Sequence, residues 1–179
     1  MNVRTTIART SPLVIAALML VAGAATGRAD AGSHATATIV DQGGTAIGTA
    51  TFFENPAGRV VVGVDVEGLS PGEHGMHLHT TGACIAGASP AFASAGGHFN
   101  PTGGVHGAHA GDLGNLSVNP QGNARTQFET AQFTLSPGLS SLLDGDGSAL
   151  VIHRDPDDGV TDPAGNSGPR VACGALVAG

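Results

Sequence analysis

The sequence is divided into short runs of strand character, and this division constrains the fold more than any other feature. Within each run apolar residues alternate with small or polar ones, and glycine, proline or asparagine follows most runs. Alternation with a period of two places the apolar side chains on one face of a β-strand. The runs cover residues 35–41, 48–55, 59–66, 75–79, 113–118, 124–130, 148–153 and 171–177.

No amphipathic helix longer than two turns is predicted between these runs. Many short strands separated by turn residues are typical of antiparallel sandwiches and barrels. We therefore predict an all-β domain of eight antiparallel strands, arranged as a sandwich or barrel. Two segments without strand character, 80–112 and 154–170, would form long loops, and loops of that length in a compact domain are usually functional.

The length and charge of the chain exclude some classes of protein. A chain of 179 residues suits one domain with a real core and is short for two. Its seven basic residues are all arginine and its net charge is −7, whereas a nucleic-acid binder needs a basic face. We therefore expect no nucleic-acid partner.

The first residues have the pattern of a secretory signal peptide. Arg4 and Arg9 precede an apolar run over residues 12–22, and the Ala-Asp-Ala triplet at 29–31 offers a small-x-small cleavage site. The run is short for a membrane span, which needs about 20 residues. A buried N-terminal helix is the alternative reading, but the arginines and the polar segment that follows favour a signal.

Residues 1–31 are thus predicted to be a signal peptide and 32–179 the mature domain. We expect export to the periplasm, the cell envelope or the medium, with no membrane attachment after cleavage. Cleavage after residue 31 would start the mature chain with Gly32, Ser33 and His34, an order that can wrap Cu(II) in square-planar geometry.

The chain has two cysteines, Cys84 and Cys173, which lie far apart in the sequence. In an oxidising compartment such a pair favours a disulfide, whose loop of about 90 residues would stabilise the fold by several kcal/mol. Two free buried thiols are the alternative. A metal site on both thiolates is less favoured, because neither cysteine has a ligand beside it in the sequence.

Six of the eight histidines fall into a pattern. His77 and His79 stand two residues apart on a predicted strand, so both imidazoles project from one face, and nitrogen-rich sets suit copper or zinc. The glycine-rich segment 96–112 holds three histidines and an aspartate, which together would complete a tetrahedral, structural zinc shell. His153 ends a late strand, where a lone histidine would indicate only a surface or core-edge residue. The four candidate zinc ligands in the segment 96–112 are His98, His106, His109 and Asp112.

Five motifs extend these patterns, in the order GMHLHTTGAC, GGHFNP, HAGDLGN, VIHRDPDDG and GPRVACGALV. Their order and content resemble those of the copper/zinc superoxide dismutases over nearly the whole mature chain. The resemblance implies a Greek-key sandwich or barrel and an exported enzyme that converts superoxide to O2 and H2O2, with one copper and one zinc per chain. A homodimer is left open, because the family uses more than one dimer interface.

The resemblance also implies a set of metal ligands. His98 would bridge the two metals and exchange a proton during the reaction. Cys84 and Cys173 would be the disulfide of the family. The implied copper ligands are His77, His79, His98 and His153, and the implied zinc ligands are His98, His106, His109 and Asp112.

Other matching residues receive supporting roles by the same resemblance. Arg170 would flank the copper channel and bind the substrate anion. Asp157 would hydrogen-bond one copper histidine and one zinc histidine, His77 and His106, and so orient both rings. His74 would pack near the site without binding metal.

The sequence departs from the family pattern in two places. Only two residues separate His106 from His109, several fewer than is usual, so we expect a weaker zinc site or a less shielding loop. The segment 154–170 is also short, carries more aspartates than arginines and contains no lysine. We therefore expect weaker long-range steering of superoxide than in better-known relatives.

Two other functions compete with the dismutase. A non-catalytic, extracytoplasmic copper- or zinc-binding protein on the same fold would typically lack a copper ligand or the channel arginine, whereas His153 and Arg170 are present. A zinc hydrolase would need an open zinc position with a water and a general base, whereas this zinc shell is full. The dismutase is the function that we expect.

Overall fold

The computed structural model describes Met1 and residues 33–179, which form β-strands, loops and one turn of 3-10 helix. The rest of the predicted signal peptide and Gly32 lie outside the described residues, so the predictions about them stay predictions. Among the residues described, no helix is long and apolar enough to cross a membrane. The elements are β1 His34–Asp41, β2 Ala46–Glu54, β3 Val60–Val66, β4 Gly72–His79, η1 Ala93–Ala95, β5 Asp112–Val118, β6 Ala124–Thr130, β7 Ala149–His153, β8 Arg170–Ala175 and β9 Val177–Ala178.

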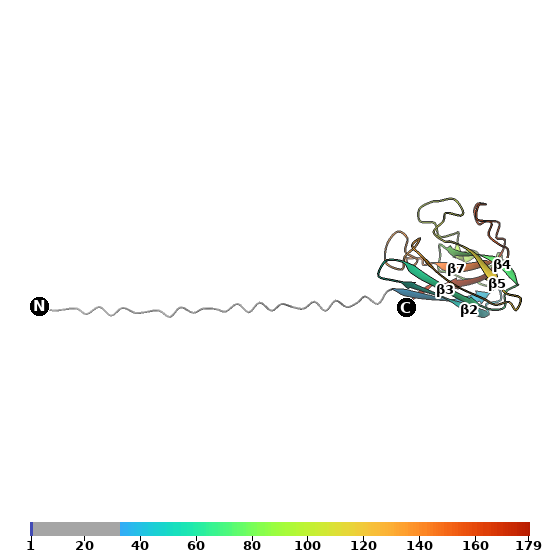
Figure 1. Cartoon of the computed structure of the whole chain (residues 1–179), viewed down its shortest axis with the longest axis horizontal. Coiled ribbons are helices and arrows are strands. Elements are labelled where there is room, and N and C mark those ends of the chain that lie inside the picture. Colours follow the sequence, from blue (N-terminus) through green and yellow to red (C-terminus); the bar gives the residue numbers. More distant parts are fainter. Residues whose placement is uncertain (2–32) are drawn as a thin grey trace.

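The strands form one antiparallel sheet that curls into a nearly closed barrel (Figure 1). Neighbouring strands follow the order β5-β4-β7-β8-β1-β2-β3-β6, and β9 pairs with β1. β4 follows β3 in the chain but lies between β5 and β7, so the connection crosses the barrel, as in a Greek key. The predicted all-β fold of eight antiparallel strands is confirmed, and each predicted run overlaps a strand.

The last predicted run, 171–177, forms two strands instead of one. β8 pairs with β7, whereas β9 pairs with β1. The change occurs at Leu176, whose amide donates to the carbonyl of Ser148 (2.9 Å) and whose side chain is buried. Because apolar and small residues continue through this change of partner, the sequence shows a single run.

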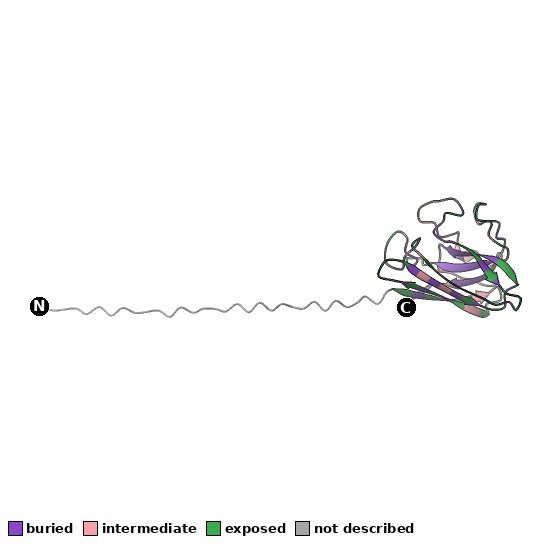
Figure 2. Ribbon diagram, in the orientation of Figure 1, coloured by how far each residue is buried: buried purple, intermediate pink, exposed green. Residues whose placement is uncertain are grey.

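Burial along the strands shows where the loops cover the barrel (Figure 2). β1 alternates exposed and buried residues over its first six positions, whereas β7 is buried at all five and β4 at its last six. Both faces of β4 are covered because the long loops bond to it. The Leu78 amide donates to the Gly111 carbonyl, and the Leu78 carbonyl accepts from the Phe99 amide. The Gly75 amide donates to the Asp155 carbonyl. Polar side chains on this outer face are thereby removed from water.

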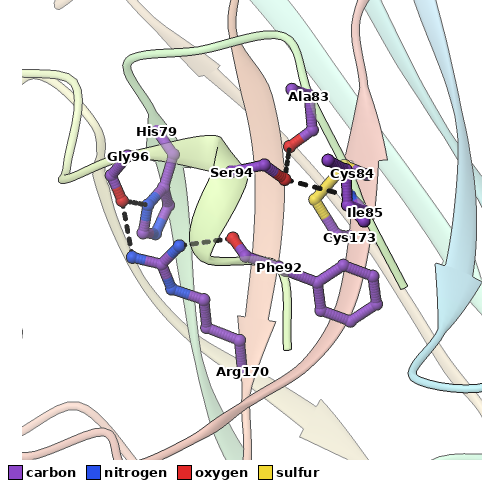
Figure 3. Close-up of a disulfide and its surroundings, with 9 residues drawn as sticks. All are labelled: His79, Ala83, Cys84, Ile85, Phe92, Ser94, Gly96, Arg170 and Cys173. Atoms are coloured by element: carbon purple, nitrogen blue, oxygen red, sulfur yellow. Dashed lines mark hydrogen bonds between the residues drawn. A yellow bond between two sulfur atoms is a disulfide. The ribbon is translucent and has the colours of Figure 1, made fainter. Parts of the chain in front are cut away.

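A disulfide joins Cys84 in the first long loop to Cys173 on β8, as predicted. Figure 3 shows the bond beside η1. The Ser94 hydroxyl of η1 donates to the Ala83 carbonyl (2.9 Å) and accepts from the Ile85 amide (3.0 Å). The disulfide and these two hydrogen bonds together fix the start of the loop against the barrel.

Removing the disulfide should lower the free energy of unfolding. The bond joins residues 89 positions apart, and the chain-entropy model assigns about 4–5 kcal/mol to a loop of that length. Urea unfolding of the metal-free protein, followed by circular dichroism, would compare the parent with the double variant Cys84→Ser/Cys173→Ser. The control Ile85→Ser changes an exposed side chain next to the bond and should shift stability by less than about 0.5 kcal/mol. Equal stability of the double variant and the parent would contradict the prediction.

Candidate metal centre

Two histidines of β4 and one of β7 lie on the loop-covered face of the sheet. His77 and His79 alternate with Leu78, which packs in the core, so the two imidazoles share the opposite face. β7 pairs directly with β4, and His153 ends β7 where its pairing with β8 shifts register. All three histidines are buried.

A fourth histidine, His98, reaches this face from the first long loop. An isolated β-bridge joins His98 to His79, and the Phe99 amide donates to the Leu78 carbonyl (2.8 Å). The Phe99 side chain is buried in the core and anchors the loop there. Because neighbouring residues of an extended segment point to opposite sides, anchoring Phe99 directs the His98 ring toward the site.

The four rings form the first ligand set, and each has a ring nitrogen with no partner among the residues that the structure describes. One ring nitrogen from each lies within 4.8 Å of the other three. An unpartnered buried polar atom is rare and costs about 1–3 kcal/mol, so four that gather at one place indicate a metal site. Four imidazole nitrogens fit copper. The unpartnered nitrogens are His77 Nδ1, His79 Nε2, His98 Nε2 and His153 Nε2.

In two of these rings the other nitrogen bonds a backbone carbonyl. His79 Nδ1 donates to the Gly96 carbonyl (2.9 Å), and His153 Nδ1 donates to the Gly168 carbonyl (2.9 Å). Each bond fixes the ring orientation and keeps the proton on Nδ1. The lone pair of Nε2 is therefore free for a metal.

The second ligand set adds three residues to His98 and lies in the glycine-rich part of the loop. Asp112 Oδ1 lies 2.7, 3.4 and 3.2 Å from the Nδ1 atoms of His98, His106 and His109. The four candidate ligand atoms lie within 4.8 Å of one another. Three imidazoles and one carboxylate are a donor set that fits tetrahedral zinc.

Asp112 also shapes the short turn between His106 and His109. Its second oxygen, Oδ2, accepts hydrogen bonds from the amides of Gly107 (2.7 Å) and His109 (3.1 Å). Gly107 has φ 86°, and a Cβ there would lie 2.2 Å from the carbonyl oxygen of Gly159. A glycine in a tight turn, held by one carboxylate, thus lets the two-residue gap bring both histidines to the same point.

Asp157 lies between the two ligand sets. Its Oδ2 accepts a hydrogen bond from His77 Nε2 (2.7 Å), and its Oδ1 accepts one from His106 Nε2 (2.8 Å). The Nδ1 atoms of both rings are left buried and without a hydrogen-bond partner. One carboxylate thus orients a ring of each set.

Arg170, the first residue of β8, lies beside His79 of the first set (Figure 3). Its Nη1 donates to the Phe92 carbonyl (2.6 Å) and its Nη2 to the Gly96 carbonyl (2.5 Å). The Gly96 oxygen also accepts from His79, so a single carbonyl ties the guanidinium to a ring of the first set. Arg170 is half-buried, and no carboxylate of the described chain lies within ion-pairing distance of it.

His74 is buried but belongs to neither ligand set. Its Nδ1 lies 2.7 Å from the His153 carbonyl oxygen, and its Nε2 lies 2.8 Å from the Ser70 carbonyl oxygen. Because both ring nitrogens contact backbone oxygens, neither is free for a metal. His74 instead holds the end of β7.

Burial keeps the rings of the first set neutral. Loss of hydration is the main cause that lowers the pKa of His77 to about 3, of His79 to about 2 and of His153 to about 4. The same cause lowers the pKa of His98. Neutral imidazole is the form that binds a metal, so these rings are ready for one at neutral pH.

The two carboxylates stay charged beside these rings. Burial alone would raise the pKa of Asp112, but hydrogen bonds from His98 and from the amides of the turn hold it below its usual value. Hydrogen bonds from His106 and His77 overcome burial in the same way and lower the pKa of Asp157. Each ligand set therefore has a full negative charge next to it.

These features define a class of protein: an antiparallel barrel whose loops bring together a four-histidine set and a three-histidine, one-aspartate set that share one ring. Residues 46–176 match the family described as copper/zinc superoxide dismutase (SODC). The chain belongs to this family.

Relatives in sequence and in structure agree with this assignment. The chain is 41% identical over 148 residues to superoxide dismutase (Cu-Zn) 2 of Aquifex aeolicus, which covers 78% of this chain and 84% of that protein. It is 38% identical over 156 residues to the superoxide dismutase (Cu-Zn) of Deinococcus radiodurans, with 79% and 83% covered. A SOD-like protein from Bacillus subtilis has a similar structure, with a TM-score of 0.74 at 35% identity over 79% of this chain and 97% of that one.

Several partners of the site were not predicted from the sequence. Asp162 Oδ1 accepts a hydrogen bond from the His106 amide (2.7 Å) and so connects the two long loops. The carbonyls of Gly96 and Gly168 orient rings of the first set. A backbone carbonyl leaves no signal in a sequence, and nothing distinguishes Asp162 there from the other aspartates of its loop.

The metal-free protein should lose stability in mild acid. Below a pH of about 6.5 the unfolded chain protonates histidines that stay neutral in the folded state, because their folded pKa values are lowered. The free energy of unfolding should thus fall by up to about 1.4 kcal/mol per pH unit for each of the three lowest-pKa rings as the pH drops toward 5. Urea unfolding of the metal-free protein at a series of pH values measures this slope.

Two variants serve as controls for this slope. Thr36→Ala, at an exposed position of β1 without a titratable group, should leave the slope unchanged. His153→Gln removes one of the buried rings and should reduce the slope by up to about 1.4 kcal/mol per pH unit. A free energy of unfolding that stays constant between pH 7 and pH 5 would rule the prediction out.

Proposed function

We propose that this chain is an exported Cu/Zn superoxide dismutase that converts superoxide to O2 and H2O2. The observation that carries the proposal is the group of five buried ring nitrogens without a hydrogen-bond partner, shared between the two ligand sets. Their neutral rings and the adjacent charged carboxylates form donor sets that fit one copper and one zinc.

In this proposal the four rings of the first set hold copper, and the three rings and carboxylate of the second set hold zinc. His98 belongs to both sets, with Nδ1 on the Asp112 side and Nε2 among the nitrogens of the first set. The chemistry supplied by the metals would be one-electron exchange with superoxide at copper, while zinc keeps its valence.

The residues of the chain would bind the anion and move a proton. Two superoxide anions and two protons give one O2 and one H2O2. Arg170 would bind each superoxide anion, since its charge is half-buried, unpaired and fixed by two carbonyls. His98 Nε2 would take a proton as O2 leaves and give it to the second product, and water would supply the other proton.

Export is part of the proposal. We assign residues 1–31 to a signal peptide and 32–179 to the mature domain, which would be secreted, periplasmic or attached to the cell envelope. The disulfide fits an oxidising compartment of that kind. Superoxide would be the partner of the site.

A non-catalytic metal-binding protein on the same fold is the second candidate. The structural relative named SOD-like, 35% identical, is the observation in its favour. The presence of all four rings of the first set and of a fixed, unpaired arginine favours the enzyme instead.

The proposal is tested by the decay rate of superoxide with the mature chain loaded with one copper and one zinc. Arg170→Ala should slow catalysis by about 10- to 100-fold, because a charge-assisted hydrogen bond contributes about 1.5–3 kcal/mol. Arg170→Lys should recover part of the loss, and the control Arg125→Ala, at an exposed ion pair on β6, should change nothing. Binding of both metals without catalysis would favour the second candidate.

Catalysis should depend only weakly on salt. The loop 154–170 carries four aspartates against two arginines, so its net charge does not attract an anion over long distances. We expect kcat/KM to change by less than about twofold between 0.02 and 0.2 M ionic strength, since screening has little steering to remove. Stopped-flow measurement across that range checks this, and a steep decline with salt would show that steering is strong after all.

A further inference from the structure

Gly165 lies directly over the hydrogen bond between Asp157 and His106. A Cβ at this position would lie 1.8 Å from Asp157 Oδ1 and 2.6 Å from His106 Nε2. These are the two atoms joined by the 2.8 Å hydrogen bond. Gly165 also has φ 60°, in the left-handed region that favours glycine. Only a residue without a side chain lets the backbone close over this bond.

The backbone at Gly165 is fixed on both sides. Its amide donates to the Thr161 carbonyl (2.6 Å), and its carbonyl accepts from the Asp158 amide (2.9 Å). The Asp158 carboxylate in turn accepts from the amides of Val160 and Thr161. Gly165 therefore cannot move away from the carboxylate without breaking this turn, and a new side chain would displace the carboxylate instead.

A second glycine faces the same carboxylate from β4. A Cβ at Gly75 would lie 2.7 Å from the Cβ of Ser167, 3.2 Å from His77 Cε1 and 3.3 Å from the Cβ of Asp157. The Gly75 amide donates to the Asp155 carbonyl (2.9 Å), which holds the loop against the strand. Asp157 thus lies in a slot between two positions that have no side chain.

We propose that Gly165 is a positioning residue for both metal sites. The absence of a side chain at Gly165 sets the place of the Asp157 carboxylate, which orients the rings of His77 and His106. In both rings Nε2 bonds the Asp157 carboxylate and Nδ1 has no partner in the described chain. These two Nδ1 atoms are the proposed metal ligands. The inference rests on the proposed function, because it takes these two histidines as ligands.

The substitution Gly165→Ala should weaken zinc binding. Its methyl group would occupy the place where Asp157 Oδ1 and His106 Nε2 meet, so the carboxylate must move and His106 loses its orienting bond. Loss of an orienting partner of this kind lowers metal affinity by about 10- to 100-fold.

The measurement is a titration of the metal-free chain with Zn(II) in competition with a chromophoric chelator. The matched control is Gly58→Ala, in the turn between β2 and β3, with φ 73° and nothing within 4 Å of its new Cβ. Both variants place an alanine at a positive φ, but only Gly165→Ala meets the carboxylate. We expect Gly58→Ala to keep the parent affinity. The Cu(II) electron paramagnetic resonance spectrum should likewise change in Gly165→Ala alone.

A second pair of variants tests whether Gly165 acts through the carboxylate. In an Asp157→Ala background, adding Gly165→Ala should cause no further loss of zinc affinity, because the group that it displaces is gone. If Gly165→Ala alone does not fold, recovery of the fold in this double variant supports the inference, and failure to recover overturns it.

Three results would overturn the inference while leaving the proposed function intact. They are a parent-like zinc affinity in Gly165→Ala, an equal loss in Gly58→Ala, and a further loss when Gly165→Ala is added to Asp157→Ala. A parent chain that binds no zinc at all would instead overturn the proposed function, and this inference with it.

Discussion

Five imidazole nitrogens are buried without a hydrogen-bond partner in the described part of the chain, and the surrounding structure is arranged to keep them there. Each such atom destabilises a metal-free fold by about 1–3 kcal/mol. The apolar core of the barrel and the disulfide between Cys84 and Cys173 supply stability that offsets this. A metal bound to these nitrogens would remove the penalty, so metal binding and the stability of the loop-covered face are linked.

The orientation of the rings depends on groups that are not ligands. Carbonyl oxygens hold His79 and His153, and the Asp157 carboxylate holds His77 and His106. Loops rich in glycine can bring backbone this close to a ring because no side chain intervenes. The glycine content of the loops, which prevents them from building a core, is therefore the property that lets their backbone take part in the site.

Much of the fold could be predicted from the sequence, because a strand with one buried face records that face in its alternation. The division of the last run at Leu176 could not, since apolar and small residues continue while the pairing partner changes. The residues that gather in the two sets could be predicted from spacing and family likeness. Their geometry could not, because it depends on the carbonyls of Gly96 and Gly168 and on the packing of Gly165 against Asp157.

The hydrogen bond from the His106 amide to Asp162 has a consequence for how the protein opens. Together with the bond from the His106 ring to Asp157, it attaches the turn of the first long loop to the second loop at two points. Detachment of either loop therefore breaks two contacts with the other. We expect the two loops to form one cooperative unit of local unfolding, in which the buried rings are exposed when both loops open together.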